Sequence, residues 1–276
     1  MYDRLFGPLG RQWLMYYFIC FMVAFFACII GKICGMGGGV IIKPVLDSTG
    51  IMDVAAINFL SGVTVVGMTC WSVGKSMVRK QSSIDLSVST PLAIGAAIGG
   101  LVGKQLFSMV ASSFADKNTA GSVQAALLLI ATLATLIYTL NRSRFSSHSL
   151  TNKPLCAVVG LFLGMLGTFL GIGGGPFNMA VMYFFFSMSA KTAAQNSLYV
   201  ILISQSVGLI SSSVTSGIPG IPAPLMAGMV LCGIVGSEAG GMINRRLDER
   251  QVNVLFELSM LLVMGISAYN IYSFLS

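Results

Sequence analysis

The stretch Gly35-Met36-Gly37-Gly38-Gly39 decides how this chain can fold, because it recurs as Gly171-Ile172-Gly173-Gly174-Gly175. The two blocks start 171 − 35 = 136 positions apart in a chain of 276 residues, so each half carries one copy. Each block follows a long apolar run. Glycine costs a helix roughly 1 kcal/mol per residue relative to alanine, so each block predicts a helix break inside an apolar segment.

Composition places these apolar runs in a membrane. Hydrophobic residues make up 55% of the chain and charged residues 9%, against about 25% charged residues in soluble domains. The mean hydropathy is +0.85. A spanning helix needs about 20 apolar residues, and several uncharged windows are long enough. The sequence predicts an all-α, polytopic membrane protein without a cleavable signal peptide.

The charged and reactive residues exclude several functional classes. The net charge of +7 fits cytoplasmic loops rich in Lys and Arg better than a nucleic-acid-binding face. The six cysteines lack CxxC spacing and His148 is the one histidine, so we expect no metal site, disulfide framework or cofactor. The glycine blocks lack the Lys-Ser/Thr of a phosphate-binding loop. We therefore predict that the chain is not an enzyme.

Two further landmarks extend the internal repeat beyond the glycine blocks. Asn58 follows the first block and Asn196 follows the second, 196 − 58 = 138 positions apart, while Gly99 and Gly236 are 236 − 99 = 137 apart. Three landmarks thus keep one register within two residues. We predict an N-terminal repeat over 1–141, a cytoplasmic connector over 142–153 and a C-terminal repeat over 154–276, which together form one transmembrane domain.

Each repeat is predicted to hold about four long helices and a short element that follows its glycine block. The short element cannot span a membrane at 1.5 Å per residue, so we expect a half-helix or a bent hairpin with the helix before it. The predicted elements cover residues 13–34, 40–46, 54–78, 86–110 and 122–140 in the first repeat, and 154–170, 176–188, 192–214, 224–245 and 251–274 in the second.

Loop charges indicate how the two repeats are oriented. The loop after the third element carries Lys75, Arg79 and Lys80 in the first repeat, but its counterpart over 212–223 has no charge. The loop after the fourth element reverses this bias, with three arginines from Arg245 onward in the second repeat. Corresponding loops would then face opposite sides, which favours inverted repeats. Parallel four-helix repeats remain the alternative, since inversion leaves the N-terminal arginines outside.

The glycine blocks have a packing interpretation and a functional one. Their GxxxG spacing is typical of closely packed membrane helices. Unwound backbone inside a membrane is otherwise tolerated only where it is buried in protein or lines a cavity, and paired breaks in two halves indicate a transporter's binding site. Free glycine N–H groups and the positive end of the following half-helix would bind an anion there. We favour the functional interpretation because both copies share these features.

Polar residues near the breaks are the candidate ligands. A buried Asn can simply join two helices, and a long Lys can reach the headgroups, yet charges inside a membrane usually mark a functional site. Glu238, deep in its helix, is the candidate for proton coupling, whereas we expect Asp47 at the membrane interface. The predicted substrate-binding residues are Gly37, Gly38, Gly39, Lys43, Asn58, Ser61, Gly173, Gly174, Gly175, Asn178, Asn196, Ser197, Gln205 and Lys104.

The glycine blocks, the segments Ala55–Asn58 and Ala193–Ser197, and the glycines around Gly99 and Gly236 together resemble the sulfite exporter TauE/SafE family of membrane transporters. The resemblance covers nearly the whole chain. It implies an inner-membrane transporter of sulfur-containing anions (sulfite, organosulfonates or thiosulfate) without a bound cofactor.

The expected function is therefore a secondary transporter that moves such an anion by alternating access. The expected partners are the small anion and the lipid bilayer, with no nucleic acid and with a homodimer as an option. A passive anion channel and a membrane-embedded subunit without transport are the alternatives. The sequence leaves open which anion moves, in which direction, and with which coupling ion.

Overall fold

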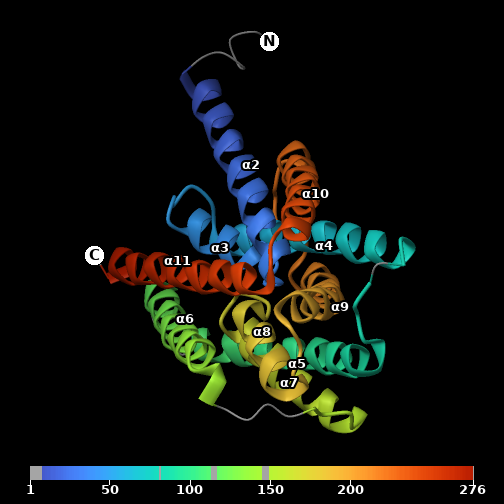
Figure 1. Ribbon diagram of the computed structural model, residues 1–276. Coiled ribbons are helices and arrows are strands. Elements are labelled where there is room, and N and C mark those ends of the chain that lie inside the picture. The colour runs from blue at the N-terminus through green and yellow to red at the C-terminus, as the bar shows by residue number, and fades with distance from the viewer. Residues whose placement is uncertain (1–7, 81, 113–116, 145–148, 276) are drawn as a thin grey trace.

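The computed structural model describes residues 8–80, 82–112, 117–144 and 149–275, which form helices joined by short loops (Figure 1). These residues include no strand, so the predicted all-helical fold is confirmed. Most helix ends lie within a few residues of their predicted positions. The α-helices are α2 (Pro8–Cys34), α3 (Gly39–Asp47), α4 (Val54–Val78), α5 (Leu86–Ser112), α6 (Lys117–Leu140), α7 (Lys153–Phe169), α8 (Gly175–Phe186), α9 (Ala190–Ser216), α10 (Ala223–Arg246) and α11 (Glu249–Leu275), and η1 (Arg142–Arg144) is a 3₁₀ turn.

Seven of the described helices are long and apolar enough to cross a membrane: α2, α4, α5, α6, α9, α10 and α11. Helix α7 is apolar but shorter, with 17 residues. Helices α3 and α8 have 9 and 12 residues, so they extend only about 14 and 18 Å, less than the roughly 30 Å of a bilayer core. The chain is therefore a multi-pass membrane protein with two short internal helices, as predicted.

The glycine blocks interrupt the helical structure between α2 and α3 and between α7 and α8. Gly35 and Gly171 hold the same place in the two blocks and have φ angles of +65° and +74°, which side chains disfavour. After the second break the chain turns back, because the N–H of Leu150, just before α7, donates to the carbonyl oxygen of Phe185 near the end of α8 at 2.9 Å. Helices α7 and α8 thus form the expected bent hairpin.

Two pairs of helices from different halves pack so closely that only glycine fits between them. At Gly99 of α5 a Cβ atom would lie 1.9 Å from the carbonyl oxygen of Leu161 in α7, and at Gly236 of α10 it would lie 2.3 Å from that of Phe25 in α2. The two contacts are equivalent in the repeat, since 161 − 25 = 136. Figure 1 shows α2 beside α10 and α5 beside α7. The fourth helix of each half therefore packs against the first helix of the other half: α5 against α7, and α10 against α2.

The equivalent helices α4 and α9 run in opposite directions where they meet. Early in α4, Gly62 faces Leu209, which lies late in α9. Just after the end of α4, the N–H of Ser83 donates to Gln195 Oε1 near the start of α9 at 2.9 Å. Helices α4 and α9 lie between the closely packed pairs, and α6 packs against α11 beside them (Figure 1).

The connector with Arg142, the start of α9 with Lys191 and the start of α11 with Arg250 meet on one face of the molecule, and the loop after α4 joins them through the contact of Ser83 with Gln195. At the start of α9 the N–H of Lys191 donates to Glu249 Oε2 at the start of α11, at 3.1 Å. Tyr183 of α8 donates to Asn253 Oδ1 of α11 at 2.9 Å, and Arg142 of the connector stacks over the Tyr183 ring at 4.3 Å. We call this side of the molecule the basic face.

Candidate functional site

A cavity of about 500 Å³, called the central cavity below, lies between the two glycine blocks. Gly39, the first residue of α3, lines one side, and Gly171 and Gly173 of the second block line another. Residues of α4, α5, α6 and α9 complete the lining, and the cavity reaches the surface at Asn58 and Gly217, which are exposed. The two breaks in the chain therefore border a single cavity.

The polar lining of the central cavity is cationic and neutral. Lys104 of α5 donates to Ser212 Oγ of α9 at 2.7 Å. Asn58, Ser61 and Gln205 add amide and hydroxyl groups. Among the described residues that line this cavity there is no Asp or Glu. A cation and neutral hydrogen-bond donors without a carboxylate suit an anionic ligand.

In the second block the glycines provide space rather than free donors. A Cβ atom at Gly173 would lie 1.5 Å from Gln205 Nε2, so the missing side chain lets Gln205 lie against the backbone. The N–H of Gly173 donates to the carbonyl oxygen of Gly167 at 2.9 Å, and that of Gly171 to Thr168 at 3.0 Å. The last turn of α7 therefore binds the N–H groups of Gly171 and Gly173, which are not free to point at a ligand.

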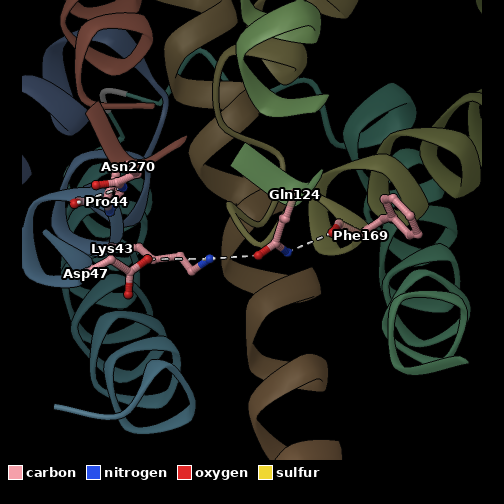
Figure 2. A network of polar contacts seen from close by, with 6 residues as sticks. All are labelled: Lys43, Pro44, Asp47, Gln124, Phe169 and Asn270. Atoms are coloured by element: carbon pink, nitrogen blue, oxygen red, sulfur yellow. Dashed lines mark hydrogen bonds and ion pairs between the residues drawn. The ribbon is translucent and has the colours of Figure 1, made fainter. Parts of the chain in front are cut away.

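Lys43 belongs to a buried polar network beside the central cavity (Figure 2). Its side chain extends toward α6, where Nζ lies 3.2 Å from Gln124 Oε1, and Nζ also lies 3.8 Å from Asp47 Oδ2. Gln124 in turn donates to the carbonyl oxygen of Phe169, the last residue of α7, at 2.9 Å. Because Gln124 lines the cavity, this network joins the buried lysine to it.

Asp47 and Gln124 are site residues that the sequence reasoning missed. The side chain of Asp47, which we expected at the membrane interface, is only 8% exposed and is therefore covered by the protein itself. Helix α3 is covered by α11, whose Asn270 donates to the carbonyl oxygen of Pro44 at 3.4 Å (Figure 2). The i,i+4 spacing of Lys43 and Asp47 was a usable signal for an ion pair. No local pattern connects Gln124 to Lys43, 81 positions away.

The two matched asparagines have different surroundings. Asn196 is fully buried, and its Oδ1 accepts hydrogen bonds from the N–H of Asp85 at 2.9 Å and from Ser89 Oγ at 2.6 Å. Its Nδ2 donates to the carbonyl oxygen of Ser83 at 3.1 Å. Asn196 therefore fastens the loop between α4 and α5 to α9. Asn58 instead is exposed and lines the central cavity.

The remaining predicted residues pack around the breaks. Ser197 donates to the carbonyl oxygen of Gly35, and Asn178 lies against Gly174. Of the predicted site residues, the central cavity brings together Gly39, Asn58, Ser61, Lys104, Gly173 and Gln205, and its lining does not include Gly37, Gly38, Lys43, Gly174, Gly175, Asn178, Asn196 or Ser197.

Glu238 lies in a second cavity of about 240 Å³, called the basic cavity below. Glu238 forms an ion pair with Lys75 and accepts a hydrogen bond from Trp71 Nε1 at 3.1 Å. Its side chain is 38% exposed, so it is not a deeply buried carboxylate. The basic cavity shares no lining residue with the central cavity. Four cationic side chains line it: Lys32, Lys75, Arg79 and Arg245.

In the part of the chain that the structure describes, no group of three or more His, Cys, Asp or Glu side chains is placed to ligate a metal. The six cysteines are free. The chemistry that both cavities offer is charge and hydrogen bonding.

Comparison with known proteins gives a family and two relatives. The family model described as sulfite exporter TauE/SafE matches residues 20–268. The chain is 20% identical over 270 residues to the probable membrane transporter protein YunE of Bacillus subtilis, which covers 90% of this chain and 96% of that protein. It is 24% identical over 254 residues to the probable membrane transporter protein MamO of Magnetospirillum gryphiswaldense, covering 82% of this chain and 40% of that longer protein. No solved structure gives a match.

Proposed function

This chain belongs to the sulfite exporter TauE/SafE family, and from that premise we propose that it is a secondary transporter for a small sulfur-containing anion. Sulfite, organosulfonates and thiosulfate form the proposed substrate class. Both relatives are named as probable membrane transporters, which supports transport as the general activity. The family is one of transporters, and we assign the chain no catalytic step.

The observation that carries this proposal is the lining of the central cavity. It combines Lys104, several amide and hydroxyl groups and the N-terminal end of α3 at Gly39, and its described lining includes no carboxylate. A helix N-terminus and a lysine both favour negative charge, and a sulfo group offers several oxygens to accept hydrogen bonds. At about 500 Å³, the cavity has room for such an anion together with part of its hydration shell.

We propose further that the two halves are inverted repeats in the cytoplasmic membrane. An axis in the membrane plane makes equivalent helices antiparallel, and α4 and α9 run in opposite directions where Gly62 meets Leu209. The positive-inside rule places the basic face in the cytoplasm. The basic cavity, lined by Arg79 and Arg245 among others, then faces the cytoplasm. The central cavity opens on the other side, at the uncharged loop that contains Gly217.

Alternating access would then use the two cavities as the two mouths of one path. The basic cavity is formed by the repeat equivalents of helices that form the central cavity: α10 and α4 in place of α5 and α9. In the state seen here, Lys75 and Glu238 bridge α4 and α10. We propose that this ion pair closes the cytoplasmic mouth, and that it opens when the central cavity closes.

A passive anion channel is the second candidate. Two cavities that share no lining residue favour a carrier, because a channel needs one continuous path. The driving force does not distinguish a channel from a carrier for export, because in either case an inside-negative potential of 100 mV contributes about 2.3 kcal/mol per charge that leaves. Accumulation of the anion against that potential would require a coupled carrier.

A substrate panel in proteoliposomes tests the proposal. The purified protein should move at least one of sulfite, sulfoacetate, taurine and thiosulfate with a saturable rate, and unlabelled anion on the far side should accelerate the exchange of labelled anion. A rate that rises without saturation would indicate the channel. If none of the four compounds moves and none raises the thermal stability of the protein in detergent, the transporter proposal is wrong.

A further inference from the structure

The Lys43–Asp47 ion pair has no counterpart in the second half of the molecule. With the repeat offset of 136, the equivalent positions of α8 are Met179 and Tyr183, which are uncharged and 0% and 2% exposed. The broken backbone therefore does not require a charged pair beside it. Burying an ion pair costs several kcal/mol unless its partners fully compensate the charges. Keeping such a pair in one half only points to a role beyond folding.

Lys43 is shared between Asp47 and Gln124, and one carboxylate oxygen of Asp47 has no hydrogen-bond partner among the described residues. Lys43 Nζ is 3.8 Å from Asp47 Oδ2 but 3.2 Å from Gln124 Oε1. It also reaches the edge of the central cavity, because a Cβ atom at the cavity residue Gly171 would lie 2.7 Å from Nζ. Asp47 Oδ1 is buried and has no hydrogen-bond partner among the described residues. The carboxylate therefore depends on Lys43 for its countercharge.

The other groups that face α3 are uncharged. Helix α11 contributes Asn270, which donates to the carbonyl oxygen of Pro44. Helix α4 contributes Ser61 beside Gly39, and α2 contributes the thiol of Cys28 beside Gly38, the residue before α3. Within the described part of the chain, Lys43 is the charged group that acts on Asp47. If Lys43 turned away, a charged Asp47 would be stranded in an apolar interior.

We infer that Asp47 is a proton-binding site, and that a sulfur-containing anion in the central cavity competes with it for Lys43. This inference rests on the proposed function. When the anion binds, the Lys43 ammonium turns from Asp47 to the anion, and the buried carboxylate takes up one proton to become a neutral acid. When the anion leaves, Lys43 returns and the acid releases that proton to the same side. One proton then travels with each anion, and Lys43 keeps its charge throughout.

The test is proton-coupled uptake of thiosulfate into proteoliposomes, because thiosulfate keeps its charge between pH 6 and 8. The membrane potential is clamped at zero with potassium and valinomycin, and the outside is made one pH unit more acidic than the inside. One coupled proton should drive about tenfold accumulation of thiosulfate, and an internal pH dye should report one proton per anion. Thiosulfate exchange without a pH gradient serves as the measure of transport itself.

Asp47→Asn should abolish the pH-driven accumulation and the proton signal while thiosulfate exchange continues. Asp53→Asn is the matched control, because Asp53 is exposed and makes no side-chain bond to the start of α4; it should accumulate thiosulfate like the natural chain. Exchange without pH-driven accumulation in the natural chain would overturn the proton site and leave the transporter proposal standing. Accumulation that survives in Asp47→Asn would also overturn it. If Asp47→Asn does not fold, the proton count of the natural chain still tests the proposal, because thiosulfate uptake without protons would overturn it.

Discussion

Lys104 of α5 reaches Ser212 of α9, and Lys75 of α4 reaches Glu238 of α10. Both contacts join the fourth helix of one half to the third helix of the other, and Lys75 and Ser212 are themselves equivalent, since 212 − 75 = 137. The same helix crossing is thus bridged twice, once by a lysine and a hydroxyl and once by an ion pair. The repeated backbone forms two cavities, and the side chains that differ between the two halves determine the lining of each cavity.

Changes to the helix packing that the two halves share should destabilise the protein more than changes to the side chains that differ between them. Gly99→Ala and Gly236→Ala should each destabilise the protein by about 3 kcal/mol, because the added Cβ would meet a carbonyl oxygen at 1.9 or 2.3 Å. Gly74→Ala is the control, since nothing lies within 4 Å of its Cβ position. Thermal unfolding in detergent measures the difference. Equal melting temperatures for Gly99→Ala and Gly74→Ala would contradict the close packing of α5 on α7.

Substitutions of the two matched asparagines should affect different properties, stability at Asn196 and substrate binding at Asn58. Asn196→Ala should cost about 2 kcal/mol, because it leaves the N–H of Asp85 and the buried Ser89 hydroxyl without their acceptor. Asn58→Ala should leave unfolding unchanged within about 0.5 kcal/mol, as is usual for exposed positions, and should raise the KM for the anion. Unfolding curves and transport kinetics are measured on both variants. The reverse pattern would mean that Asn196, not Asn58, serves the ligand.

Lys104 should act on substrate affinity. Lys104→Gln should raise the KM for the transported anion about tenfold, the loss expected for one charge-assisted contact, because it removes the cation from the central cavity. Arg246→Gln removes a charge from the exposed end of α10 and serves as the control for net charge. Uptake measured over a range of substrate concentrations distinguishes them. If KM shifted equally in both variants, Lys104 would act on substrate affinity through long-range electrostatics and not through direct contact.

The smallest expected effect concerns the ion pair at the basic cavity. Glu238→Gln should speed the labelling of a cysteine placed at Ser76 about threefold, because a partly exposed pair is worth up to about 1 kcal/mol and Ser76 lines that cavity. The experiment needs a background without the native cysteines, of which Cys70 is exposed. Asp248→Asn, at the exposed start of α11, is the control. Unchanged labelling in Glu238→Gln would remove the pair from any gating role.

Local sequence patterns were enough to predict the helices and the breaks. Apolar runs of about 20 residues require spanning helices in a membrane, and consecutive glycines such as Gly173 and Gly174 weaken a helix wherever they fall. The repeat register also predicted that Gly99 and Gly236 have equivalent roles. These predictions needed only the spacing of residues along the chain.

The site was harder to predict because it depends on contacts between distant residues. Asn58 and Asn196 are equivalent in sequence, yet only the fold shows that the loop at Ser83 occupies the amide of Asn196. Gln124 acquires its role from Lys43 and from the end of α7. Asp47 was assigned to the interface from its place near the end of a predicted helix, and the covering by α11 could not be foreseen from that end.

The exchange of first helices between the halves has a consequence for synthesis. Helix α2 leaves the ribosome long before its partner α10, because Phe25 and Gly236 are 236 − 25 = 211 positions apart. At roughly 5–20 residues per second, α2 waits some 10–40 s in the membrane with its packing surface uncovered. Helices α5 and α7 are translated close together and can pair early. Assembly should therefore begin at α5 and α7 in the middle of the chain, and α2 should dock only after α10 has been made.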